Sequence, residues 1–445
     1  MWAVRGEVPP LVEEGRSHDS PSQLPTEIWE RIVEFATEIP GVYATEDHAA
    51  IAGFSRDRYG ICLSNWFKDA VETKLALSRV SRYWNNLMQL FLLRHIRIKT
   101  GRQACETAIA LKRLTKRAKP DDGPGKWTLR VEIALDGIHA WTEKHTKAMR
   151  TIFKSCPNIT CFSTVFSTAD PYVYSCPTLI GYLSAHRSLK RLELKFDAEV
   201  LGAVVQGLGP TLQVLWLYPC RRITRDRDIG RYLFPSLRVL ISEALCEPYV
   251  KALTAPNLEA CVIDLSFEPS LLPVMNRSRM QYLATSNVQR IASKLESWSN
   301  LKTLSVTYYE LATQAIPWPT KSMIHLRLEC IMIEEINGKE HTHLRVNLAH
   351  LISVHMFPNL KHVRLFLPVE DRTDYSPVLP DSVRLLWFEW LRDCQFLGIR
   401  IEISQGIYQW TEDFWRAISF EELAEILFPP LLEVIEDDRI LDTTL

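Results

Sequence analysis

Leu189-Lys190-Arg191-Leu192-Glu193-Leu194 places an apolar residue first, another three positions later and a third two positions after that. The last two apolar residues are two apart, so their side chains point to the same face of a β-strand. The first marks the point where the chain enters the strand. The stretch therefore predicts a strand with one face buried and its alternate residues on the other face.

The same pattern recurs through the chain from residue 156 onward, with copies that begin at Ile159, Leu189, Leu212, Leu237, Leu258, Met280, Leu301, Met323 and Leu360. Six of the eight intervals are 21–25 residues long, within the period of leucine-rich repeats. One repeat cannot close a core, whereas stacked repeats can. The predicted fold class is α/β, a solenoid with parallel strands and helical or irregular returns. A mixed domain of ordinary βαβ units remains the alternative.

Two N-terminal segments are predicted to be helical. Residues 23–36 form a helix that starts at Pro25, because proline suits the first helical position. Residues 75–87 contain apolar positions at helical spacing, with Ser78 and Ser81 as candidate caps between two short helices. The first helix carries an apolar stripe of Leu24, Ile28, Ile32 and Phe35. These helices either cap the rest of the fold or form a docking module with part of their apolar surface left for a partner.

Two sequence patterns in these segments resemble an F-box, namely Leu24-Pro25-x-Glu27-Ile28-x-x-x-Ile32 and Leu77-x-x-Val80-Ser81-x-x-Trp84-x-x-Leu87. Leu92–Ile98 is similar to the entry into the first strand in F-box proteins of mushroom-type (basidiomycete) fungi. The resemblance covers residues 23–98. Ser81 stands where a cysteine is common, and an insert at about 38–74 separates the two halves. Leucine-rich C-terminal halves also occur in F-box proteins, which agrees with the repeats.

The resemblance implies a substrate-recognition subunit of a cullin–RING (SCF-type) ubiquitin ligase, with a Skp-type adaptor as its partner. The implied adaptor-binding residues are Leu24, Pro25, Ile28, Ile32, Leu77, Val80, Trp84 and Leu87. A protein target would bind the concave face, where the strand residues alternate with the buried ones. Those residues are Glu193, Lys195, Trp216, Tyr218, Ile241, Glu243, Val262, Asp264, Ser305, Thr307, Arg327, Glu329, Arg364 and Phe366.

The composition limits the classes of function and partner that the sequence supports. Lys and Arg total 52 against 53 Asp and Glu, so charge gives no reason to expect nucleic acid or a membrane surface as partner. The ten cysteines are scattered without metal-ligand spacing and are expected to be buried thiols in a reducing compartment. The first twenty residues contain no apolar signal region, so the sequence predicts a cytoplasmic or nuclear protein. The sequence contains no phosphate-binding or nucleophile motif. We expect no cofactor, no metal and no enzymatic activity.

Residues 99–119 contain a basic helical run that is either a solvated face or a patch for an acidic partner. Arg221–Arg227 is a second basic cluster and the best candidate for binding a phosphorylated or acidic target.

A leucine-rich scaffold without a ligase role and an enzyme with an unrecognised site remain the alternative functions. The predicted organisation is a disordered tail (1–21), F-box (22–98), basic helix and solenoid entry (99–155), repeats (156–380), and a last repeat with an acidic cap (381–445).

Overall fold

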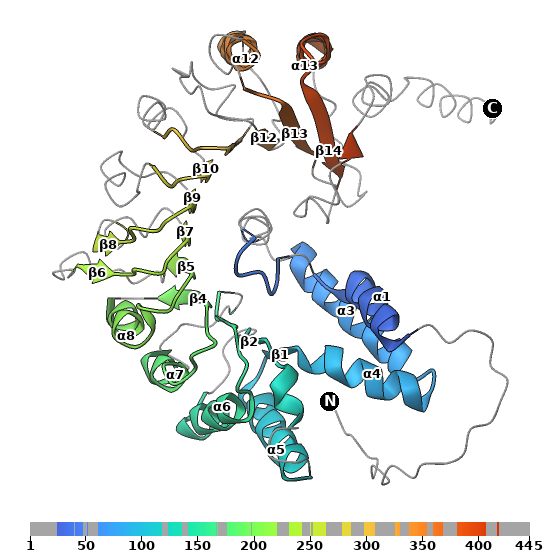
Figure 1. Cartoon of the computed structure of the whole chain (residues 1–445), viewed down its shortest axis with the longest axis vertical. Helices are drawn as coiled ribbons and strands as arrows, with labels where there is room; N and C mark the ends of the chain where they lie inside the picture. The colour runs from blue at the N-terminus through green and yellow to red at the C-terminus, as the bar shows by residue number, and fades with distance from the viewer. Residues whose placement is uncertain are drawn as a thin grey trace, which may run out of the picture.

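Among the residues that the computed structural model describes, three helices precede a long curved sheet (Figure 1). They are α1 (Thr26–Thr37), α3 (Ile61–Ser78) and α4 (Arg82–Leu93), which we call the N-terminal helical unit. The structure describes residues 25–39, 41–47, 51, 61–117, 123–135, 141–165, 167, 176–196, 198–219, 231–242, 250, 252–263, 278–285, 298–307, 325–329, 338–353, 359–367, 381–405 and 416–417.

The main sheet of the described residues contains 13 strands that lie side by side in chain order. All neighbouring pairs are parallel except the last, which is antiparallel. The strands are β1 (His95–Ile98), β2 (Arg130–Ile133), β3 (Cys161–Ser163), β4 (Arg191–Phe196), β5 (Val214–Pro219), β7 (Val239–Ser242), β9 (Ala260–Ile263), β10 (Tyr282–Thr285), β11 (Thr303–Thr307), β12 (His325–Glu329), β13 (His362–Leu367), β14 (Arg400–Gln405) and β15 (Arg416–Ala417). Two short strands, β6 (Tyr232–Leu233) and β8 (Leu253–Thr254), pair separately in parallel.

Helices cover the outer, convex side of the curve, as Figure 1 shows for α5 to α8. They are α5 (Gly101–Arg117), α6 (Glu143–Ser155), α7 (Cys176–Leu183), α8 (Ala198–Leu208), α12 (Gly338–Leu351) and α13 (Asp381–Phe396), with a 3-10 turn, η1 (Pro124–Trp127), before β2. The main apolar core lies between these helices and the sheet. The structure is therefore α/β with a parallel-strand sheet and is consistent with the predicted repeat solenoid.

The register of the sheet matches the repeat pattern. The middle apolar residue of each copy pairs with that of the next, so Leu192 lies beside Leu215, and Leu215 beside Leu240. The row continues through Cys261, Leu283, Leu304, Leu326 and Val363. A strand is present at all nine predicted copies. The sheet also extends beyond them, because β1 and β2 precede the first copy and β14 follows the last.

The helical predictions are confirmed with one change of boundary. Ser81 caps α4, with its hydroxyl accepting a hydrogen bond of 3.2 Å from the Trp84 amide. The run after Lys99 is helix α5, and the two wider repeat intervals hold α7 and α12. However, α3 begins at Ile61, so the last part of the predicted insert continues into the helix predicted from residue 75.

Some predictions fall outside the described residues. They are the tail at 1–21, Leu24, the basic cluster Arg221–Arg227, and most of the acidic C-terminal region. Among the helices that the structure describes, none combines the length and apolar character needed to cross a bilayer.

Candidate functional site

The N-terminal helical unit has a small core of its own. Trp29 of α1 and Trp84 of α4 form an edge-to-face pair, with ring centroids 5.1 Å apart and an interplanar angle of 69°. Each helix therefore turns one face inward. The fully buried members of this core are Val33, Leu87, Met88 and Phe91.

The other face of α1 carries large apolar side chains in contact with solvent. Ile28, Ile32 and Phe35 are 40%, 43% and 78% exposed and follow one another at helical spacing. Val80 and Tyr83, around the turn between α3 and α4, are 66% and 46% exposed. The Tyr83 hydroxyl donates a hydrogen bond of 3.2 Å to the side chain of the first residue of α1. We call these five residues the apolar helix face, a type of surface that marks interaction sites in soluble proteins.

The predicted adaptor-binding residues divide between this face and the core. Pro25, Ile28, Ile32 and Val80 are exposed. Leu77 and Trp84 are partly buried against the helical core, and Leu87 is buried within it. The prediction that Leu87 faces a partner is wrong, because the apolar stripe of α4 turns inward. Leu24 lies outside the described residues.

Phe35 and Tyr83 extend the exposed face beyond the predicted set. The helical spacing of the α1 stripe already pointed to Phe35. The side chain of Tyr83, by contrast, is placed on this face by the turn between α3 and α4, which the sequence pattern did not specify.

The segment after α1 enters the inside of the curved sheet, where Figure 1 shows it between α3 and the strands. Ile39, Val42 and Ile51 are buried there with apolar side chains from the concave side of the strands. Phe67 of α3 joins the same cluster. The strand residues of this cluster are Val214, Trp216, Val239, Ile241, Ala260, Val262, Tyr282 and Ala284. The predicted insert is thus a structural part of the concave face.

A buried charged cluster lies beside these apolar contacts. The Arg130 guanidinium, which is fully buried, donates hydrogen bonds of 2.7 and 2.9 Å to the two carboxylate oxygens of Glu193. It also donates to Glu132 at 3.0 Å and to the carbonyl oxygen of Val42 at 3.3 Å. Arg130 therefore joins two strands of the sheet to the segment after α1.

Arg191 makes a second connection of the same kind. Its Nη1 donates hydrogen bonds to the carbonyl oxygens of Gly41 (2.5 Å) and Ala44 (2.8 Å), and its Nε lies 2.6 Å from Glu193 Oε1. Gly41 has φ +76°, a left-handed conformation that favours glycine. The turn at residues 41–44 thus presents backbone carbonyls to two buried arginines.

The two carboxylates of this cluster stay ionised. Burial alone would raise the pKa of Glu132, but a hydrogen bond to His95 and the charge of Arg130 hold it well below its usual range. Burial opposes ionisation of Glu193 as well, and Arg130 and Arg191 nevertheless lower its pKa. The pKa of His95 is lowered mainly by burial. The cluster is therefore a set of mutually compensated buried charges, which suits a structural role.

These contacts correct the predicted target-binding face. Glu193, Trp216, Ile241, Val262 and Ser305 are all buried, so they are not available to a target in this structure. The error arose because strand alternation identifies the concave side but does not say whether another segment covers it.

Two other predicted residues, Lys195 and Tyr218, are partly exposed, and the Lys195 ammonium lies 5.4 Å from the Tyr218 ring centroid. Thr307, Arg327, Glu329, Arg364 and Phe366 lie on β11 to β13, and their side chains are outside the described part of the structure. Glu243 and Asp264 are outside it entirely.

Comparison of this chain with known proteins does not assign it to a family. No protein-family model and no curated protein matches the chain. A crystal structure of a protein from Bacteroides fragilis aligns with 66% of this chain and 69% of its own, at 11% identity and a TM-score of 0.30.

Proposed function

We propose that this chain is the substrate-recognition subunit of an SCF-type ubiquitin ligase and acts as a receptor, not as an enzyme. The N-terminal helical unit would be an F-box that binds a Skp-type adaptor. The observation that carries the proposal is the apolar helix face, where Ile28, Ile32 and Phe35 of α1 are exposed, as is Val80 in the turn between α3 and α4. An amphipathic helix that leaves apolar side chains uncovered is suited to docking against a partner.

The attachment of the helical unit supports the same proposal. A receptor of this kind must hold its target at a defined position relative to the adaptor. Arg130 and Arg191 bind the segment that leaves α1, and β1 follows α4 directly. These two connections restrict the movement of the helices against the sheet, which the proposed task requires.

The protein target would bind the sheet outside the region where Ile39, Val42 and Ile51 are buried. Lys195 and Tyr218 border that region and combine a cation with an aromatic ring, which is a suitable pair for a protein ligand. Glu193, Trp216, Ile241, Val262 and Ser305 are not part of this proposed surface, because they are buried.

Co-purification of the full chain with a Skp-type adaptor tests the first half of the proposal. The informative variant is Ile28→Asp/Ile32→Asp, because both side chains are exposed and their exchange leaves the helical core intact. Ile109→Asp is the matched control, since this apolar residue is 51% exposed on α5, away from the apolar helix face. We expect the wild type and the control to bind the adaptor and the double variant to lose it. Adaptor binding that survives the double variant would overturn the proposed face.

A leucine-rich interaction scaffold is the second candidate. The burial of Ile39, Val42 and Ile51 in the concave face favours the scaffold, because these residues of the insert then contribute to stability and not to adaptor binding. In that case, the helical unit only closes the end of the sheet. A folded wild-type chain that fails to bind any Skp-type adaptor would select this candidate.

A further inference from the structure

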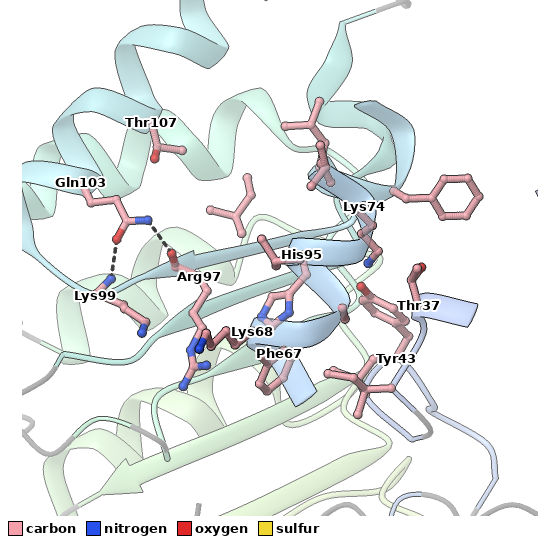
Figure 2. Close-up of a pocket in the computed structure, with 18 residues that line it drawn as sticks. Thr37, Tyr43, Phe67, Lys68, Lys74, His95, Arg97, Lys99, Gln103 and Thr107 are labelled. Atoms are coloured by element: carbon pink, nitrogen blue, oxygen red, sulfur yellow. Dashed lines mark hydrogen bonds between the residues drawn. The ribbon is translucent and has the colours of Figure 1, made fainter. Parts of the chain in front are cut away.

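A cavity of about 420 Å³ lies where the N-terminal helical unit meets the start of the sheet. Figure 2 shows it between α3, the strand that contains His95 and Arg97, and the segment that contains Tyr43. Its volume is within the usual range for small-molecule sites. The apolar part of the wall includes Phe67, Leu92 and Ile96.

Lys74 of α3 is the unusual residue of this cavity. It is only 8% exposed, and its ammonium group makes no hydrogen bond or ion pair with any residue that the structure describes. Burial lowers the pKa of Lys74 to about 8, and the charge of Glu38 only partly offsets this effect. A buried ammonium is costly unless a counter-charge lies close, and Glu38 compensates only part of this cost.

The other cations at the cavity differ from Lys74. Arg97 is paired with Glu132 at 2.8 Å, and Lys68 lies 3.9 Å from Glu72. In Figure 2, Lys68, Arg97 and Lys99 lie together at one side of the cavity, and Lys74 lies at the other, near Tyr43. No Asp or Glu is among the described residues that line the cavity. The cavity therefore combines apolar walls with basic side chains, and none of its described lining residues is a carboxylate.

We propose that this cavity binds a small organic carboxylate with an apolar body. The carboxylate would pair with the Lys74 ammonium, and the body would lie against Phe67, Leu92 and Ile96. A single negative charge fits because a single buried ammonium needs compensation. A phosphate dianion would leave an uncompensated charge against apolar walls. The inference concerns a ligand site and does not depend on the ligase proposal.

The position of the site gives the ligand a structural consequence. The lining residues come from α3, α4, β1 and α5 and from the segment after α1. A bound carboxylate would therefore contact the helical unit and the sheet at once. Because it binds the assembled form, it should stabilise the whole chain against unfolding.

The test compares 4-phenylbutyrate with its neutral amide, 4-phenylbutanamide, by calorimetric titration of the full chain at pH 7. We expect the carboxylate to bind about tenfold more tightly or better, the factor typical of one charge-assisted hydrogen bond. Equal binding of the two compounds, or binding of neither, would overturn the proposal. Tighter binding of phenyl phosphate than of the carboxylate would overturn the assignment to a single negative charge.

Three variants locate the effect. Lys74→Met keeps the length of the side chain and should abolish the preference for the carboxylate, whereas Lys74→Arg should retain it. Lys68→Met is the control, because Lys68 lines the same cavity but is mostly exposed. Thermal unfolding of each variant verifies that it is folded. A preference that persists in folded Lys74→Met would show that the carboxylate binds elsewhere.

Discussion

Arg191 Nη1 donates a hydrogen bond of 2.5 Å to the carbonyl oxygen of Gly41, which lies 150 residues earlier in the chain. This contact joins the fourth strand of the main sheet to the segment that leaves α1. The Arg191 side chain that makes this contact has no solvent exposure. The N-terminal helices and the sheet are thus connected through a buried guanidinium as well as through the chain itself.

Arg191→Met should lower the free energy of unfolding by about 3–5 kcal/mol, because it leaves Glu193 with one fewer compensating charge and two carbonyls without a donor. Urea unfolding measures the loss. Arg238→Met is the control. Its partner Glu259 is 2.8 Å away, but the pair is partly exposed, so we expect a loss of about 1 kcal/mol or less. Similar losses in both variants would contradict a special role for the buried cluster.

Trp84→Ala should destabilise the chain by about 3–5 kcal/mol, because the ring packs in the helical core. Adaptor binding by this variant is therefore informative only if the variant remains folded. A double-mutant cycle with Trp29→Ala should give a coupling energy of about 0.5–1.5 kcal/mol for the edge-to-face pair. Additive effects of the two substitutions would show that the rings do not interact in solution.

Trp216→Ala should cost about 3–5 kcal/mol of stability, because the indole is 2% exposed under the segment that follows α1. Tyr218→Ala is the comparison, since Tyr218 lies two residues further along the same strand and is partly exposed. We expect it to cost clearly less. Thermal and urea unfolding distinguish the two, and equal losses would mean that the concave face is covered as far as Tyr218.

Lys74→Met should stabilise the chain at pH 7, by up to about 3 kcal/mol from the difference between a pKa of about 8 and the ordinary 10.5. Below pH 8, the ammonium is charged in both states, and its burial penalises the folded state fully. As pH rises from 8 to 10.5, the folded state loses its proton first and the penalty declines. The gain of the variant should therefore shrink over this range and vanish above it. Unfolding curves at pH 7, 9 and 10.5 test this, and a gain that does not depend on pH would contradict a buried ammonium.

The repeat pattern predicted the sheet because the buried positions of each strand can be recognised from the residues of that strand alone. Leu192, Leu215 and Leu240 are apolar for the same local reason and therefore form one row. Sequence spacing also identified the capping role of Ser81 and the exposed stripe of α1. These features depend on short-range periodicity, which a single sequence displays.

The covered concave face depends on contacts between distant segments, and periodicity does not report those. One signal was nevertheless present. Val214-Leu215-Trp216-Leu217 is apolar at every position, and a strand without alternation is typically buried on both faces. The apolar residues of the insert, such as Ile51 and Phe67, were the other half of that signal. The sequence contains no such signal for Lys74, because the burial of its ammonium and its distance from carboxylates depend on the tertiary fold.

The contacts of Arg130 and Arg191 with residues 41–44 have an evolutionary consequence. Both arginines bind main-chain oxygens, and every amino acid supplies the same carbonyl. A substitution at Ala44 therefore leaves the bond that its carbonyl accepts in place, although the Ala44 side chain packs against the apolar cluster of the concave face. Gly41 is an exception, because its positive φ disfavours other residues. Among relatives of this chain, the two arginines, the glycine and the length of the turn should persist, together with an apolar residue at the buried position of Val42.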